Sequence, residues 1–114
     1  MPDCLFCKIA NHEIPASIVY EDDAVVAFND INPQAPTHIL VVPRQHIATL
    51  NDLKPGDDQI VGEVVRRAAA IAAERKISAG GYRVVFNTNR DAGQTVFHIH
   101  LHLIGGRNLG WPPG

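Results

Sequence analysis

The sequence predicts an α+β fold in which one long helix packs on a mainly antiparallel sheet. Segment 57–76 carries apolar residues at helical spacing, and several short segments rich in β-branched residues are bounded by turn residues. Strands and helices do not alternate along the chain, as they would in a parallel sheet. Since the chain has 114 residues, 46% of them hydrophobic, we expect residues 1–114 to form a single domain.

The first half of the chain predicts three strands. The segments "IPASIVYEDD" and "AVVAFNDINPQAPTH" hold the first two, and the acidic residues 21–23 suit the hairpin turn between them. Two prolines make residues 32–36 a loop, because proline breaks the ladder of a sheet. The third strand is "THILVVP", which we expect to stop at Pro43.

The second half of the chain predicts the long helix and two further strands. The helix is expected over residues 57–76, because its acidic start and basic end suit the helix dipole, and Gly80 and Gly81 are expected to end it. A shorter helix is expected over 47–53. After the long helix come the strand "GYRVVFN", the polar loop "TNRDAGQT" and a last strand, "FHIHLHLIGG".

The last strand carries three of the six histidines at every second position. Because successive side chains of a strand point to opposite faces, His98, His100 and His102 share one face. The isoleucine and leucines between them then face the core, under the long helix. A passive, half-exposed face is the alternative reading, but threonine, lysine or glutamate would serve equally well there. The outer two Cα atoms lie about 13 Å apart, so binding of one metal ion by all three histidines would be strained. We therefore expect one end of the row to be structural and the rest catalytic.

Histidines in the middle and at the far end of this row suit nucleophilic attack on phosphorus. With a pKa near 6.5, imidazole is mainly neutral at pH 7, and its attack divides nucleotidyl transfer into two displacements. The preceding loop supplies further groups, since Gly93 allows close backbone approach and Gln94 and Thr95 carry polar side chains. This loop is not a Walker loop, because it lacks Gly-Lys-Ser/Thr and precedes a strand.

The composition excludes several classes of protein. A formal net charge of −2 provides no basic surface for nucleic acid. No stretch approaches the roughly 18 apolar residues of a membrane span, and "MPDCLFCKIANHE" does not have the features of a signal peptide. Two cysteines are too few for a disulfide framework. We therefore expect a cytoplasmic protein that binds neither nucleic acid nor a membrane.

The sequence resembles the histidine triad (HIT) family of nucleotide hydrolases and transferases. "HIHLHLI" has the family's triad pattern, and "FCKI", "NDINPQAPTHILVVP" and "GGRNLGWPPG" resemble the Hint branch, the purine nucleoside phosphoramidases. The resemblance spans nearly the whole chain. It implies the HIT fold, with a five-stranded antiparallel sheet, one long helix and one short helix. It also implies a homodimer with a continuous sheet, formed through the long helix and a central strand.

The resemblance implies a role for each catalytic side chain. His100 would be the nucleophile that becomes adenylylated or guanylylated, and His102 would hold the α-phosphate. His38 would orient the triad or exchange protons with it. Thr95 stands where the Hint branch usually has serine, and its hydroxyl would help to protonate the leaving amine.

The resemblance also implies the nucleotide-binding residues. Asn87, Gly93 and Gln94 belong to the loop that meets the phosphate, and Asp30 would bind the ribose hydroxyls. The apolar cleft around the purine would be formed by Leu5, Phe6, Ile9, Phe28 and Ile31, with Asn29 at the edge of the base. From the residues alone, these five apolar side chains would be ordinary core. Trp111 would lie near the active site of the partner subunit; without the resemblance it is a large aromatic residue at a loose end.

Cys4 and Cys7 have C-x-x-C spacing, which permits three readings. A redox pair would need a preceding strand in a βαβ unit, and none precedes residue 4. The thiols could otherwise lie unliganded in a small apolar cluster. A structural zinc site needs two more ligands, for which His46 and His98 are the candidates. Related proteins of the HIT family carry such a Cys-Cys-His-His site. His12 belongs to no motif, and we expect it to be a surface residue.

Several functions therefore remain open at the level of sequence. The leading hypothesis is a purine nucleoside phosphoramidase or nucleotidyl hydrolase that cleaves P–N or related bonds at the α-phosphate through a nucleotidyl-His100 intermediate, without an organic cofactor. The alternatives are a nucleotide-binding regulatory module, a dinucleoside polyphosphate hydrolase, and a metalloenzyme in which zinc at the triad activates water.

Overall fold

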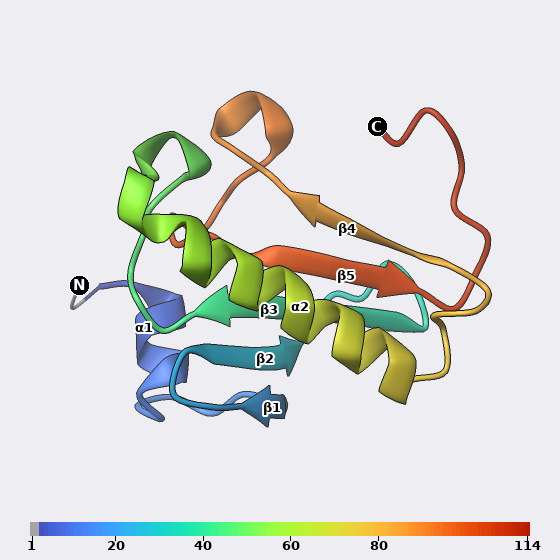
Figure 1. Cartoon of the computed structure of the whole chain (residues 1–114), viewed down its shortest axis with the longest axis horizontal. Coiled ribbons are helices and arrows are strands. Elements are labelled where there is room, and N and C mark those ends of the chain that lie inside the picture. The colour runs from blue at the N-terminus through green and yellow to red at the C-terminus, as the bar shows by residue number, and fades with distance from the viewer. Residues whose placement is uncertain (1–2) are drawn as a thin grey trace.

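Five strands form one antiparallel sheet in the order β1-β2-β3-β5-β4 (Figure 1). The computed structural model describes residues 3–114, and the strands are β1 (Ile18–Glu21), β2 (Val25–Asn29), β3 (Thr37–Pro43), β4 (Tyr82–Phe86) and β5 (Leu101–Gly105). The helices are α1 (Leu5–Ala10) and α2 (Asp58–Glu74), and short 3-10 turns occupy Leu50–Asp52, Pro55–Asp57 and Arg90–Ala92. The predicted five-stranded α+β fold is confirmed. Neither helix within residues 3–114 has the length and apolar character needed to span a membrane.

Both faces of the sheet are buried, which explains why β2 is apolar from Val25 to Phe28 and β3 is apolar from Ile39 to Pro43. Alternate residues point to opposite faces, and each face meets a helix. Helix α2 crosses one face, as Figure 1 shows, where a cluster is formed by Val25, Ala27, Ile39, Val41, Val64, Ala68, Ile71, Ala72, Leu101 and Leu103. The opposite face packs against α1 through Phe6, Ile9, Ala10, Val26, Phe28, Leu40 and Val42. The predicted packing of Leu101 and Leu103 under the long helix is confirmed, and each such buried side chain contributes about 1.5–3 kcal/mol.

Helix α2 ends earlier than the sequence predicts. The expected glycines, Gly80 and Gly81, lie in the turn before β4, well beyond the last helical residue. Lys76 ends the helix in their place by adopting a left-handed conformation with φ of 63°. The N–H of Ile77 then bonds to the carbonyl of Ala72 at 3.0 Å, as in a Schellman motif.

The predicted position of the short helix needs correction. The helix expected over 47–53 is only a 3-10 turn at Leu50–Asp52, which is capped by the side chain of Thr49. The α-helix lies instead at the N-terminus, where Cys4 caps α1 by accepting the N–H of Cys7 at a sulfur-to-nitrogen distance of 3.4 Å. Six residues are too few for a helical period to be recognised in the sequence.

The histidine strand also starts later than predicted. The ladder between β3 and β5 ends before it reaches Pro43, which has no N–H to extend it. The N–H of Ile99 bonds instead to the carbonyl of Ile47 at 2.7 Å. The first two histidines of the row, His98 and His100, therefore lie in the segment that leads into β5 and not in the strand itself.

The predicted hairpin turn between β1 and β2 is organised by Asp22. One carboxylate oxygen accepts the N–H groups of Ala24 and Val25 at 2.8 and 2.9 Å. The other accepts the hydroxyl of Tyr20 and the Nε of Arg67, both at 2.7 Å. Partial burial by itself would raise the pKa of Asp22, but these hydrogen bonds outweigh burial and hold the pKa well below its ordinary range.

Replacement of Asp22 tests this turn. Asp22→Asn should lower the free energy of unfolding at pH 7 by about 1–3 kcal/mol, because hydrogen bonds to a charged acceptor are lost. Since the pKa is depressed in the folded state, this stability is present above the unfolded-state pKa of about 3.9 and declines as the pH falls below it. Urea unfolding of both proteins should therefore show a smaller difference at pH 3 than at pH 7. The exposed neighbour provides the control: Asp23→Asn should cost less than about 0.5 kcal/mol, and equal losses in the two variants would contradict the role of Asp22.

Candidate active site

A cavity of about 400 Å³ opens on the α1 side of the sheet, where the histidine segment meets β2 and the residues after it. It brings together most of the residues that the sequence selects for nucleotide binding or catalysis: Leu5, Phe6, Ile9, Phe28, Asn29, Asp30, Ile31, Thr95, His100 and His102. Its walls also include residues that the sequence did not single out: Ile14, Pro15, Ala16, Ser17, Leu40 and Val96. These side chains come from segments more than 80 residues apart, between Leu5 and His102.

The five apolar residues of the predicted cleft divide into two kinds. Phe6, Ile9 and Phe28 are at most 6% exposed and belong to the core cluster against α1, so they are both core and cavity wall. Leu5 is 45% exposed and Ile31 is fully exposed, yet both line the cavity. Ordinary core packing therefore does not account for Leu5 and Ile31, whose apolar side chains are free to contact a ligand.

His100 is oriented by a backbone carbonyl. Its Nδ1 lies 2.8 Å from the carbonyl oxygen of His98, and because a carbonyl only accepts, Nδ1 is the donor. In the neutral ring, Nε2 then carries a lone pair. Burial lowers the pKa of His100, although the bond to the carbonyl opposes the shift, so the ring is neutral at pH 7. His100 thus has the protonation state that a nucleophile requires.

His102 belongs to a second group of polar side chains, together with His38 and Asp30. The Nε2 of His38 lies 2.9 Å from the Nδ1 of His102 and 3.4 Å from a carboxylate oxygen of Asp30. Burial, followed by the neighbouring histidines, lowers the pKa of His102 to about 4, so this ring is also neutral at pH 7. His38 is buried behind His102 and is not among the residues that line the cavity.

The loop before the histidine segment differs in part from the prediction. Thr95 is exposed and lines the cavity, as expected. Gln94 instead directs its amide into the loop, where it donates to the carbonyls of Ala48 and Val96 and accepts the N–H of Asn89. Its side chain is 5% exposed and shapes the loop, so the sequence-based expectation of a free polar side chain was wrong for this residue.

Three further predicted residues do not line the cavity. Gly93 has φ of 85°, a left-handed conformation that suits glycine and turns the chain at the end of a 3-10 turn. Asn87 is half-buried just after β4. Trp111 is 82% exposed near the C-terminus. The contact of these three residues with a nucleotide therefore stays a prediction.

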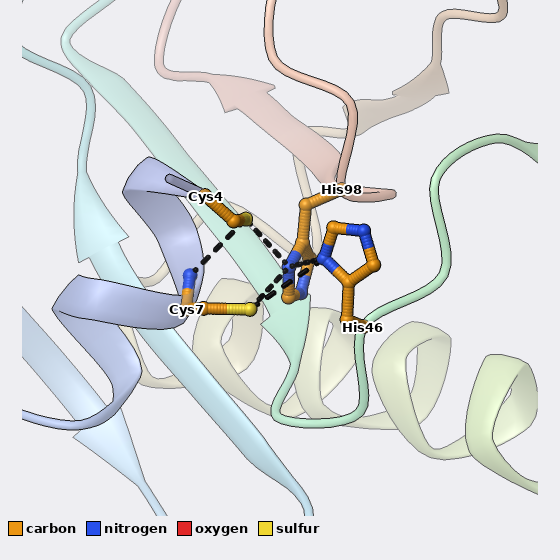
Figure 2. A group of neighbouring side chains, drawn as sticks. All are labelled: Cys4, Cys7, His46 and His98. Atoms are coloured by element: carbon orange, nitrogen blue, oxygen red, sulfur yellow. Dashed lines mark hydrogen bonds between the residues drawn. The ribbon is translucent and has the colours of Figure 1, made fainter. Parts of the chain in front are cut away.

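The two cysteines meet two histidines, as Figure 2 shows. Cys4 and Cys7 project from the start of α1, His46 follows β3, and His98 precedes β5. The four candidate ligand atoms all lie within 4.8 Å of one another. The Nδ1 of His98 is 3.3 Å from the sulfur of Cys4 and 3.3 Å from the Nδ1 of His46. This cluster could hold a metal ion.

The chemistry of His98 fits a metal ligand. Its Nε2 lies 2.7 Å from the carbonyl oxygen of Pro43 and must donate to it, which leaves the lone pair on Nδ1 facing the two sulfurs. The ring has no exposed surface, and this burial lowers its pKa to about 4. Both thiols are free and not joined in a disulfide. Cys4 packs against the apolar cluster on α1, as in the reading without a metal. The sulfurs of both cysteines also contact imidazole nitrogens, as a shared metal site requires.

Sequence reasoning missed the backbone groups on which this site depends. The carbonyls of Pro43 and His98 and the N–H of Gln34 each bond to a histidine ring. Every residue carries such groups, so no residue type signals them.

The prediction that His12 is a surface residue is confirmed, because its side chain is 57% exposed and bonds to Glu21 at 2.9 Å.

Fold and site together define a class of small α+β protein in which a row of buried histidines meets an apolar cavity. A family model described as "HIT domain" matches residues 11–109. The chain therefore belongs to the HIT domain family, and the resemblance seen in the sequence is confirmed.

Individual relatives agree with this assignment. The chain is 52% identical to the "purine nucleoside phosphoramidase" of Escherichia coli (strain K12) over 108 residues, which cover 95% of this chain and 91% of that protein. The crystal structure of a HIT family hydrolase from Legionella pneumophila Philadelphia 1 superposes with a TM-score of 0.97 at 54% identity, over 98% of this chain and 100% of that one. A histidine triad protein from Clostridium difficile gives a TM-score of 0.94 at 47% identity, over 96% of each chain.

Two alanine variants should separate the core from the exposed wall of the cavity. Phe28→Ala should lower the free energy of unfolding by about 3–5 kcal/mol, because a buried aromatic ring is lost. Ile31→Ala should change it by less than about 0.5 kcal/mol, because the side chain is already in water. Urea unfolding measures both values. A loss above about 1 kcal/mol for Ile31→Ala would show that Ile31 has a structural role after all.

Proposed function

We propose that the protein is a HIT family hydrolase that cleaves P–N bonds of purine nucleoside phosphoramidates through a covalent nucleotidyl-His100 intermediate. The observation that carries the proposal is the hydrogen bond from the Nδ1 of His100 to the His98 carbonyl, which leaves a neutral Nε2 in the ring that lines the cavity. The name of the Escherichia coli relative supports this choice of substrate class.

In the proposed first step, the Nε2 lone pair of His100 attacks the α-phosphorus. An Nε2–P bond forms while the bond from phosphorus to the leaving amine breaks, and the amine nitrogen takes up a proton that solvent supplies. The imidazole ring gains positive charge in this step, so the hydrogen bond from Nδ1 to the carbonyl strengthens as the transition state is approached. Thr95 lines the cavity, and its hydroxyl would donate a hydrogen bond to the leaving nitrogen.

In the proposed second step, water attacks phosphorus and the Nε2–P bond breaks. The nucleoside monophosphate leaves, a proton of the water passes to solvent, and His100 returns to its neutral form. Binding in both steps would use the apolar wall for the purine and the Asp30 carboxylate for the ribose hydroxyls. An N–H of His102 would donate to the α-phosphate, and Asn29 would lie at the edge of the base.

We also propose that Cys4, Cys7, His46 and His98 hold a structural zinc ion. Two thiolates and two imidazoles are a ligand set that zinc takes in closed structural sites, and the bond from His98 to Pro43 provides the outer-shell contact typical of ligating histidines. When bound, zinc would hold the side chain of His98, whose carbonyl orients His100. The four residues do not line the cavity, so we assign the ion no step in the reaction.

A homodimer is part of the proposal. β4 is an edge strand that exposes apolar side chains, with Tyr82 at 36% and Val84 at 40%. Val65 on α2 is 42% exposed. An edge strand and a helix with exposed apolar residues suit the pairing of two copies into a continuous sheet. In such a dimer, Trp111 would contact the partner.

The covalent step is tested by intact mass. Protein mixed with adenosine 5′-phosphoramidate and quenched rapidly in acid should gain the mass of one AMP, and His100→Ala should show neither the adduct nor turnover while still binding AMP. Full activity in His100→Ala would reject His100 as the nucleophile. AMP binding with no adduct and no turnover, in wild type, would favour the nucleotide-binding module. Faster cleavage of diadenosine polyphosphate than of the phosphoramidate would favour that branch of the family.

Metal analysis tests the proposed zinc site. Protein purified without chelator should contain about one zinc per chain, and a Cys4→Ser/Cys7→Ser double variant should lose it and unfold at a lower temperature, because zinc stabilises only the folded state. His12→Asn, which alters a surface histidine, is the control and should keep its zinc. Metal-free wild type with a Cys4–Cys7 disulfide would support the redox reading, and metal-free protein with free thiols would support the apolar cluster.

A further inference from the structure

The loop between β2 and β3 determines where two histidines carry their protons. We infer that the backbone N–H of Gln34, held in position by Arg107, fixes His38 with its proton on Nε2, and that His38 in turn fixes His102 with its proton on Nε2. Arg107 is thereby a positioning residue, although it lies on the surface and does not line the cavity. The catalytic meaning of this inference rests on the proposed function, whereas the tautomers themselves do not.

The distances around His38 determine its tautomer. The N–H of Gln34 points at Nδ1 of His38 with a nitrogen-to-nitrogen distance of 3.0 Å. An amide N–H only donates, so this Nδ1 is an acceptor without a proton, and the proton of the neutral ring sits on Nε2. From there it donates to His102 Nδ1 at 2.9 Å in preference to the Asp30 carboxylate at 3.4 Å.

The same reasoning then determines the tautomer of His102. Its Nδ1 accepts from His38, so its own proton is on Nε2. His100 has the opposite tautomer, since its Nδ1 donates to the His98 carbonyl. Two histidines that line one cavity therefore present different groups: His100 has a lone pair on Nε2 and His102 has an N–H. The proposed reaction needs one of each, a nucleophile for phosphorus and a donor for the phosphate oxygens.

Arg107 bonds to the loop between β2 and β3. Its Nε donates to the carbonyl of Gln34 at 3.1 Å, the same residue whose N–H faces His38. The chain turns here at Gly106, which has φ of 92° and approaches Pro36 so closely that a Cβ on Gly106 would lie 3.0 Å from it. The turn after β5 and the loop before β3 are thus in direct contact. The N–H and the carbonyl of Gln34 belong to the two peptide groups on either side of its Cα, so loss of the Arg107 bond would free this residue, and with it the preceding N–H, to move away from His38.

The first test reads the tautomers directly in unmodified protein. Two-bond ¹H–¹⁵N correlation spectra of ¹⁵N-histidine-labelled protein at pH 7 should show protons on Nε2 of His38 and His102 and on Nδ1 of His100. A proton on Nδ1 of His38 would overturn the inference. So would a second metal ion per chain that is lost in His38→Ala, because Asp30, His38 and His102 also lie close enough to share an ion. No substrate enters this measurement, so its result is independent of whether the phosphoramidase proposal holds.

The second test compares two arginines that tether the same C-terminal segment. Arg107→Met should mix the tautomers of His38 and His102 and lower kcat about two- to tenfold, as expected for the loss of one hydrogen bond, with KM nearly unchanged. Arg107→Lys, which keeps a donor, should recover part of this loss. Arg83→Met removes the bond to the Gly110 carbonyl at 2.8 Å, which does not involve the Gln34 loop, and should leave the tautomers intact and kcat within about twofold. Equal losses in Arg107→Met and Arg83→Met, or a lower kcat with native tautomers in Arg107→Met, would refute a positioning role.

Discussion

The hydrogen bonds of one buried residue, His98, join the two functional parts of this protein. Its Nε2 donates to the Pro43 carbonyl, its Nδ1 faces the thiols of Cys4 and Cys7, and its backbone carbonyl accepts from His100. With no exposed surface, the ring exchanges none of these contacts with water. A buried acceptor left without its donor costs about 1–3 kcal/mol, so the orientation of the ring is strongly determined. The proposed metal site and the proposed nucleophile, His100, consequently share one anchor.

The pairing of β3 with β5 determines which face of the sheet becomes the site. In this register Leu40 lies opposite His102, which places His38 one diagonal step away on the same face. A slip by one residue would turn every side chain of β5 to the other face and bury His102 under α2. The apolar residues Leu101 and Leu103 oppose such a slip, because they fill the space beneath that helix. The same leucines that stabilise the core therefore direct His102 toward the cavity.

Much of the fold and of the candidate site could be predicted, because it depends on the type of side chain at each position. Alternation along the histidine segment predicts that Leu101 and Leu103 lie under the long helix. The ligand chemistry of Cys4 and Cys7 makes His46 and His98 candidates for the same cluster. The α1 helix could not be predicted, since six residues are too few for a period and its cap is an unusual one, Cys4. The late start of β5 depends on Pro43, which is distant in sequence from the strand it interrupts.

The orientation of Gln94 and the tautomers of the histidines were beyond sequence reasoning for a different reason. Both depend on backbone carbonyls and N–H groups, which every residue possesses, and on distances that only the folded chain defines. Burial also lowers the pKa of His98 and of His102 to about 4, and the sequence alone does not show this burial. The sequence thus points to the side chains of the candidate site, whereas the surrounding backbone determines their hydrogen bonds.

The lining of the cavity differs from that of phosphate sites built on lysine and arginine side chains. Within residues 3–114, no lysine or arginine is among the side chains that line it. A phosphate bound there would be held by neutral N–H and O–H dipoles and not by paired charges. Dipolar contacts at short range are little affected by dissolved ions, whereas sites built from surface cations weaken steeply as ionic strength rises. Nucleotide affinity at the proposed site would consequently be insensitive to salt, and the product would leave without an ion pair to break.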